Sequence, residues 1–242
     1  MWEQFKRPAR ADRFQKKLNR EMEEVFIRNA IEFGNMPPRD WRFFLDPAVY
    51  VVLLGTGPDG SCGLAADSSS SWTAVLGFLS PVDAHIEGIL RAKPGLGYEV
   101  RQACRVPEQH FRAENGEWSL SLHLSWVALD GRMLLSPGGE EPCRLSRLVS
   151  KEAGEEAPIF FEVDAIALDD ADYLYECAGL YAWEHTHKHP PLPVERAAQY
   201  ALREGHPMRL PLDADRSRLE LALFDPEGRN WHYLPRQVAF ES

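Results

Sequence analysis

The stretch that most constrains the fold is residues 71–92, SWTAVLGFLSPVDAHIEGILRA, where an uncharged apolar run meets an amphipathic pattern at a Ser-Pro pair. Residues 72–79 are rich in β-branched, aromatic and aliphatic side chains and carry no charge, which is typical of a strand buried on both faces. Ser80 suits a helix N-cap, Pro81 the first helical position, and Asp83 the positive end of the helix dipole. The sequence therefore predicts a core strand that leads directly into a helix, whose apolar face comprises Val82, Ile86, Ile89 and Leu90.

Length and composition predict a globular protein. The 242 residues suffice for one large or two small domains, and 44% of them are hydrophobic and 26% charged, unlike a disordered chain. No apolar run approaches the roughly 18–20 residues of a membrane span, and the charged start lacks the apolar core of a secretory signal. The cysteines lack the paired spacing of a metal site, so we expect reduced thiols and a cytoplasmic location; they are Cys62, Cys104, Cys143 and Cys177.

Charge is unevenly distributed along the chain. The net charge is −10, yet residues 1–20 hold seven basic side chains against Glu3 and Asp12, and the remaining 222 residues carry −15. A body of that charge repels nucleic acid and favours basic partners.

Further strands and helices follow from periodicity in the first half of the chain. Apolar residues recur at helical spacing over residues 12–33, and residues 48–54 predict a strand. Residues 118–126 alternate strictly between apolar side chains and Ser or His, which predicts a strand with one apolar and one solvated face. Asp130 and Gly131 then predict a two-residue hairpin turn.

The second half alternates between loops, helices and a hairpin. Residues 136–157 are rich in Gly, Pro, Ser and Glu and predict a linker or long surface loop, with a helical turn at RLSRLV as an option. Residues 158–163 predict a strand, residues 169–183 a helix with Asp169, Asp170 and Asp172 in its first turn, residues 193–203 another helix, and residues 218–234 a hairpin.

These patterns predict an α+β fold of mixed, mostly antiparallel sheets with helices packed on one side. Two regions are expected: residues 1–114, with the amphipathic N-terminal helix, and residues 115–242, with hairpins and an acidic loop and helix.

Two patterns resemble sites of known chemistry. Residues 55–60, GTGPDG, match a dinucleotide-binding fingerprint after a strand, but no helix pattern follows, so a turn between two strands is the simpler interpretation. His185, His187 and His189 allow a metal site, although a polar helix end explains them as well. Because no activated Ser or Cys and no convergent carboxylate pair is apparent, we predict no enzyme, no catalytic residue, no metal ligand and no cofactor.

Acidic side chains are dense between residues 139 and 176. A surface of this kind can be simply a solvated one, or it can steer a basic protein into a complex. The predicted partner-binding residues are Glu140, Glu141, Glu152, Glu155, Glu156, Asp169, Asp170, Asp172 and Glu176.

The order of helix, strand, polar turn and the segment GFLSPVDAHIEGIL resembles the N-terminal domain of the SseB (enhanced serine sensitivity) family, over residues 20–106. That resemblance implies a bacterial binding module from toxin and secretion neighbourhoods, type VI secretion among them. It lends no functional residues to this chain.

Charge and resemblance together lead to one hypothesis, a cytoplasmic immunity-type protein that neutralises a cognate secreted toxin by stoichiometric occlusion. Its predicted partner is a basic protein toxin or effector, with neither nucleic acid nor membrane insertion. The alternatives are a secretion-system adaptor or chaperone for an effector and, second, a metal- or nucleotide-dependent enzyme.

Overall fold

The computed structural model describes residues 49–55, 62–68, 73–106, 108–112, 118–137, 139, 141–151, 163 and 165–237. The helix predicted at residues 12–33 and most of the strand predicted at 158–163 lie outside these ranges. The strands are β1 (Tyr50–Gly55), β2 (Cys62–Leu64), β3 (Ala66–Ser68), β4 (Thr73–Phe78), β5 (Tyr98–Gln102), β6 (Trp118–Leu129), β7 (Arg132–Leu135), β8 (Arg144–Lys151), β9 (Met208–Arg209), β10 (Leu219–Asp225) and β11 (Asn230–Pro235). The helices are α2 (Pro81–Arg91), α3 (Ala165–Cys177), α4 (Trp183–Lys188) and α5 (Val194–Gly205), with 3-10 turns at Ala103–Arg105, Glu108–Phe111 and Arg216–Arg218.

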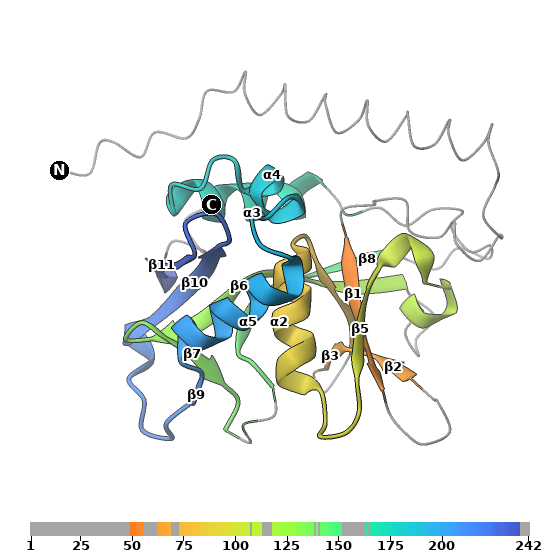
Figure 1. The fold of residues 1–242 in the computed structure, drawn as a ribbon, viewed down its shortest axis with the longest axis horizontal. Coiled ribbons are helices and arrows are strands. Elements are labelled where there is room, and N and C mark those ends of the chain that lie inside the picture. The colour runs from red at the N-terminus through yellow and green to blue at the C-terminus, as the bar shows by residue number, and fades with distance from the viewer. Residues whose placement is uncertain are drawn as a thin grey trace.

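The eleven described strands form one mixed sheet, whose main path runs β11-β10-β6-β4-β1-β2 (Figure 1). The pairs β4–β6 and β7–β9 are parallel, and the other pairs of described strands are antiparallel. The predicted α+β class with a mixed, mostly antiparallel sheet is thus confirmed. Strand β6, from the second expected region, pairs with β4 from the first as well as with β8 and β10. The described residues of the two regions therefore share one sheet.

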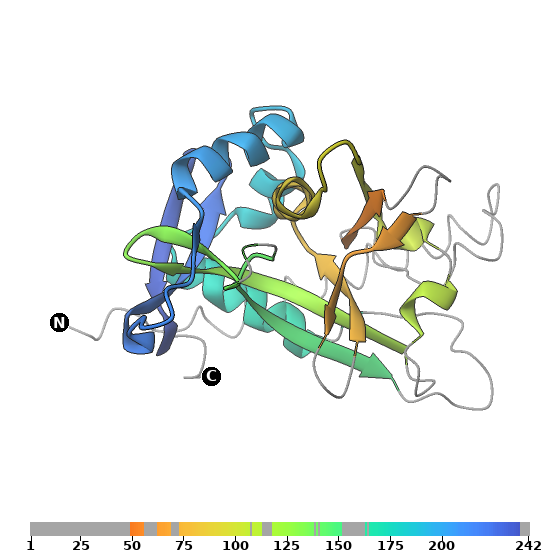
Figure 2. The same ribbon diagram turned by 90° about the horizontal axis from the view of Figure 1, so that it is seen from below.

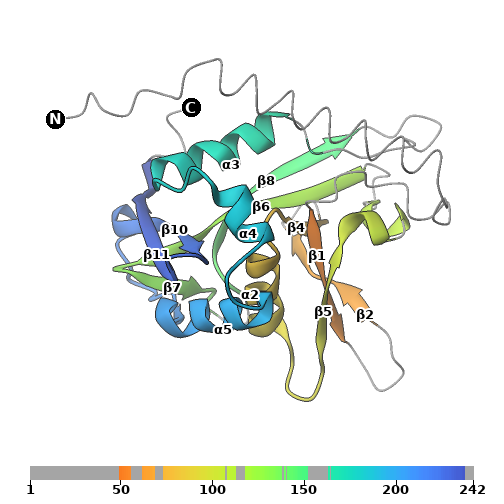
Figure 3. The same cartoon turned by 45° about the horizontal axis from the view of Figure 1, so that its top comes forward.

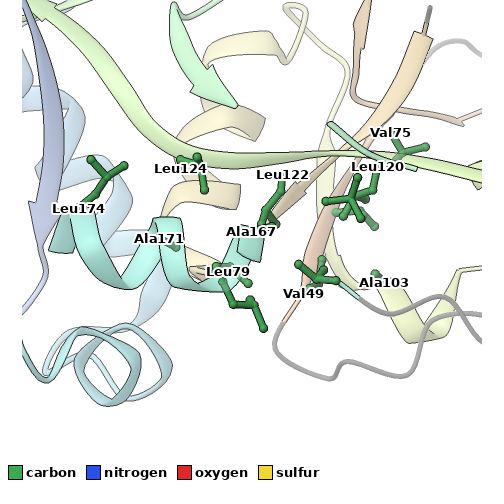
Figure 4. Close-up of a cluster of buried hydrophobic side chains, with 14 of the residues drawn as sticks. Val49, Val75, Leu79, Ala103, Leu120, Leu122, Leu124, Ala167, Ala171 and Leu174 are labelled. Carbon is green, nitrogen blue, oxygen red and sulfur yellow. The ribbon is translucent and has the colours of Figure 1, made fainter. Parts of the chain in front are cut away.

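The helices cover both faces of the sheet, whereas the sequence predicted them on one side. On one face α3 packs its Ala171 and Leu174 against Leu122 and Leu124 of β6 (Figure 4). On the other face α2 and α5 enclose a second core, around Phe78 of β4. Figure 3 shows α3 beside β6 and β8, apart from α2 and α5. Helices pack on both faces of the sheet because the central strands carry apolar side chains on both faces.

The junction between β4 and α2 forms as the sequence predicts. The Ser80 hydroxyl accepts a hydrogen bond from the Asp83 amide at 3.2 Å, and Pro81 occupies the first turn. This cap satisfies an amide that has no partner within the helix.

Three other predicted elements are confirmed. Asp130 and Gly131 have φ angles of 51° and 70°, which suit the tight turn of the β6–β7 hairpin. Helix α5 and the β10–β11 hairpin lie where the sequence placed them. Strands β1 and β2, which flank residues 56–61, pair antiparallel with each other. This pairing agrees with the predicted connection between two strands and not with the helix that a nucleotide-binding fingerprint requires.

Strand β6 is longer than predicted, and its predicted solvated face is buried. Ser121 and Ser125 are 1% and 0% exposed, and His123 packs against Phe78 with ring centroids 5.1 Å apart. The register against β8 shifts between His123 and Ser125, which marks a bulge. At this bulge the apolar side chains of β6 change from one face of the sheet to the other. Leu124 therefore faces α3, whereas Trp126 lies in the core under α2.

The prediction of a loop over residues 136–157 is wrong for its middle, because Arg144–Lys151 forms β8 and pairs with β6 along its full length (Figure 2). This strand is not apparent from the sequence, because RLSRLVSK carries basic and polar residues that suggest a solvated segment. Pairing with the longest strand of the sheet supplies the backbone hydrogen bonds that decide its conformation.

Helix α3 begins at Ala165, earlier than predicted, and ends at Cys177. Asp169, Asp170 and Asp172 therefore lie in its middle, and its first turn has no acidic residue. Gly179 has a φ angle of 78°, a left-handed conformation that glycine adopts freely, so the chain turns there and starts α4 as a separate helix.

Candidate functional site

The candidate site is the surface where α3 lies across β8, here called the α3–β8 surface. Its outward residues on the helix are Ile166, Asp169, Asp170, Tyr173 and Glu176, which recur at three- and four-residue steps and so share one face. The opposite face of α3 packs on the sheet through Ala167, Leu168, Ala171 and Leu174. The amphipathic pattern of the helix therefore presents these five side chains outward.

A pocket of about 190 Å³ lies in this surface, between the helix and the strand. Its floor is apolar, from Leu124 and Leu174, and its polar rim includes Arg147, Asp170 and Tyr173. Arg147 of β8 donates to the Asp170 carboxylate, and both side chains are partly exposed. A pocket with an apolar floor and an exchangeable ion pair at its rim can receive one long side chain, such as Lys or Arg.

Exposed apolar area adjoins the pocket. Ile166 is 60% exposed, although most large aliphatic side chains of the described residues are buried. Asp169, one turn further on, is also exposed, and Glu176 is half-buried. The arrangement of an apolar anchor beside carboxylates is typical of a protein-binding surface with a polar rim.

The structure separates the acidic residues that the sequence grouped together. Asp169, Asp170 and Glu176 share the outer face of α3. Asp172 is instead buried and accepts a hydrogen bond from the Trp183 indole at 3.0 Å. Glu141 pairs with Arg91 of α2 at 2.8 Å, away from α3. The remaining predicted residues, Glu140, Glu152, Glu155 and Glu156, lie outside the described residues.

Sequence reasoning missed a buried charge network on the α2 side of the sheet. Arg144 of β8 donates to Glu87 of α2 at 2.9 Å and to Asp67 of β3 at 3.3 Å. The hydroxyls of Ser121 and Ser146 donate to the same Asp67 carboxylate at 2.7 and 3.0 Å. Burial raises the pKa of Glu87, and the nearby Arg144 and Arg91 oppose that rise. A buried charge of this kind persists because it is paired and hydrogen-bonded.

A second buried carboxyl group lies at the start of α2. Asp83 is 3% exposed and accepts a hydrogen bond from the Trp126 indole at 2.8 Å. Burial raises its pKa to about 6, although the bonds from Trp126, Ser80 and Tyr175 oppose this rise. The sequence indicated Asp83 as a helix-dipole residue, but its contact with β6, more than forty positions away, had no local signal.

The three histidines do not act together. His187 is 1% exposed and packs edge-on against Tyr175 and Trp183, and burial lowers its pKa to about 4. The rings of His185 and His189 are exposed with centroids 5.2 Å apart. Within the described ranges, no group of three or more His, Cys, Asp or Glu side chains is arranged to hold a metal ion. His187 is thus a core residue.

Two general expectations can be compared with the described part of the chain. Among the described residues, Cys104, Cys143 and Cys177 do not form disulfide bonds. None of the helices described in the structure has the length and apolar character needed to cross a bilayer.

Comparison of the chain with protein-family models, with curated proteins and with solved structures yields no match. The resemblance to the SseB family therefore stays a prediction.

Proposed function

We propose that this protein is an immunity-type inhibitor, which binds a basic secreted toxin and occludes it stoichiometrically through the α3–β8 surface. The observation that carries the proposal is the composition of that surface, where Ile166 is 60% exposed beside the carboxylates of Asp169 and Asp170 and next to an open pocket. A cytoplasmic location and a bacterial source belong to the same proposal.

The charge of the chain supports a basic partner. At a net charge of −10, the protein attracts cationic surfaces and repels anionic ones, which speeds the encounter with a basic protein. The pocket then offers a place for a cationic side chain, whose aliphatic part would lie on Leu124 and Leu174 while its charge replaces Arg147 at Asp170. Charge would thus guide the encounter, and Ile166 and Tyr173 would contribute the apolar contact.

The first test is binding between the purified protein and the product of the neighbouring gene, measured over a range of salt. We expect a one-to-one complex that weakens as salt rises from about 0.1 M to about 1 M, because the Debye length falls from about 10 Å to about 3 Å. Asp169→Lys and Ile166→Ala should each weaken binding by roughly tenfold.

Asp213→Lys is the matched control, because Asp213 is also an exposed carboxylate but follows β9, at the edge of the fold away from α3 in Figure 1. It should bind within about twofold of the unaltered protein, since a distant rim charge contributes little. A complex that is insensitive to salt, or one that Asp169→Lys and Asp213→Lys weaken equally, would contradict the proposed surface. Protection of cells that express the toxin separates inhibition from the adaptor function, because an adaptor leaves its cargo active.

A further inference from the structure

A second pocket, the α2–β5 pocket, lies on the other face of the sheet from α3. Its volume is about 460 Å³, within the range of pockets that hold small molecules. Its polar lining includes His85 of α2, Glu99 and Arg101 of β5, and Arg105 after that strand. Pro81, Val100 and Val194 form an apolar wall. The mixture of an apolar wall with a few convergent polar groups is typical of a ligand site.

His85 presents a hydrogen-bond donor at this pocket. Its Nδ1 lies 3.0 Å from the Tyr98 hydroxyl, a hydrogen bond that orients the ring. When Nδ1 accepts from this hydroxyl, the neutral imidazole carries its hydrogen on Nε2 and can donate it to a ligand.

The two arginines add positive charge to the same pocket. Arg101 uses Nε and Nη2 to bind the Glu99 carboxylate at 2.7–3.0 Å, which neutralises Glu99 and leaves Nη1 for another acceptor. Arg105 is exposed and forms no ion pair with any residue that the structure describes. The charged side chains that line the pocket therefore have an excess of one positive charge, and the Glu195 carboxylate acts on His85 from outside this lining.

We propose that the α2–β5 pocket binds a small anion of the carboxylate or phosphate class, held by Arg105, by Nη1 of Arg101 and by Nε2 of His85. A planar guanidinium suits both kinds of oxyanion, and a donor fixed by Tyr98 adds direction to the charge. Pro81 and Val194 would contact the non-polar part of a carboxylate ligand. This site is separate from the α3–β8 surface and does not depend on the function proposed for it.

The test is a titration of the full chain with inorganic phosphate and, separately, with succinate, each against sodium chloride at matched ionic strength. The His85 side-chain NMR resonances and calorimetry give the dissociation constant. We expect one of the two anions to bind with a dissociation constant on the order of 1 mM. The His85 side-chain resonances should shift as this anion binds. Whichever anion binds more tightly identifies the class of ligand.

Arg105→Ala should weaken binding by about tenfold, and Arg105→Lys by less, because a lysine retains the charge but lacks the fork of donors. Arg203→Ala is the matched control, since Arg203 is an exposed arginine of α5 outside the pocket lining. Circular dichroism establishes that each variant is folded. The proposal is overturned if neither anion shifts His85 beyond the chloride control, or if Arg105→Ala and Arg203→Ala weaken binding to the same extent.

Discussion

At the scale of single residues, Asp83 shows how the tertiary structure changes the role of a side chain. In sequence it is a first-turn carboxylate that suits the helix dipole, but the fold buries its carboxyl group against Trp126 and Tyr175 and raises its pKa from 3.8 to about 6. The folded state therefore binds a proton on Asp83 more tightly than the unfolded state does. The stabilisation from that proton is fully present below pH 3.8 and is lost as the pH rises through about 6.

Asp83→Asn should remove this pH dependence. An amide keeps an acceptor for the Trp126 indole and carries no charge, so the variant avoids a penalty of about 3 kcal/mol that the ionised carboxylate has at pH 8. We expect its free energy of unfolding in urea to exceed that of the unaltered protein at pH 8, and the difference to shrink toward pH 4. Glu87 contributes a pH dependence of the same sign, which cancels when the two proteins are compared at each pH.

Asp83→Ala is the control for this prediction, because it removes the charge together with the partner of the indole. It should be destabilised by about 1–3 kcal/mol relative to Asp83→Asn at every pH. If Asp83→Asn has the same pH profile as the unaltered protein, Asp83 does not titrate as described.

At the scale of elements, the close approach of α2 to β5 depends on Gly88. A Cβ atom built at this position would lie 2.1 Å from the Tyr98 ring, so any side chain must displace that tyrosine. Tyr98 also holds His85 from the same helix. The absence of a side chain at Gly88 thus sets the spacing between α2 and β5 and, through Tyr98, the orientation of His85.

Gly88→Ala should destabilise the protein by about 1–3 kcal/mol, although alanine is favoured over glycine by about 1 kcal/mol in an exposed helix. Overpacking against the Tyr98 ring exceeds the gain in helix propensity. Gly97→Ala is the control, because a Cβ there meets no atom within 4 Å, and it should change the stability by less than about 0.5 kcal/mol. Equal stability of the two variants in urea unfolding would contradict this packing.

At the scale of the whole molecule, the charge network joins parts that are distant in sequence. The side chain of Arg144 on β8 is 5% exposed and binds Asp67 of β3 and Glu87 of α2, so three elements meet at one guanidinium. These contacts cross between residues 1–114 and 115–242. The two regions therefore share buried charges as well as a sheet.

A double-mutant cycle tests this coupling. Arg144→Met should cost about 3–5 kcal/mol at pH 7, because it leaves Glu87 buried without its main counter-ion. The double variant with Glu87→Gln should lose less than the sum of the single losses, by about 0.5–3 kcal/mol. Urea unfolding gives both values, and additive losses would show that the two side chains do not act as a pair.

Local chemistry in the sequence determined the elements whose partners are chain neighbours. Ser80 and Pro81 start α2, and Asp130 with Gly131 turn the β6–β7 hairpin, because a cap or a tight turn depends on a few adjacent residues. The tertiary structure alone decided that Arg144–Lys151 is a strand and that the serine face of β6 is buried, since both depend on residues far away in the chain. The same holds for the acidic side chains: their density is a property of the sequence, but packing against the sheet and Trp183 decides that Asp169 faces solvent and Asp172 does not.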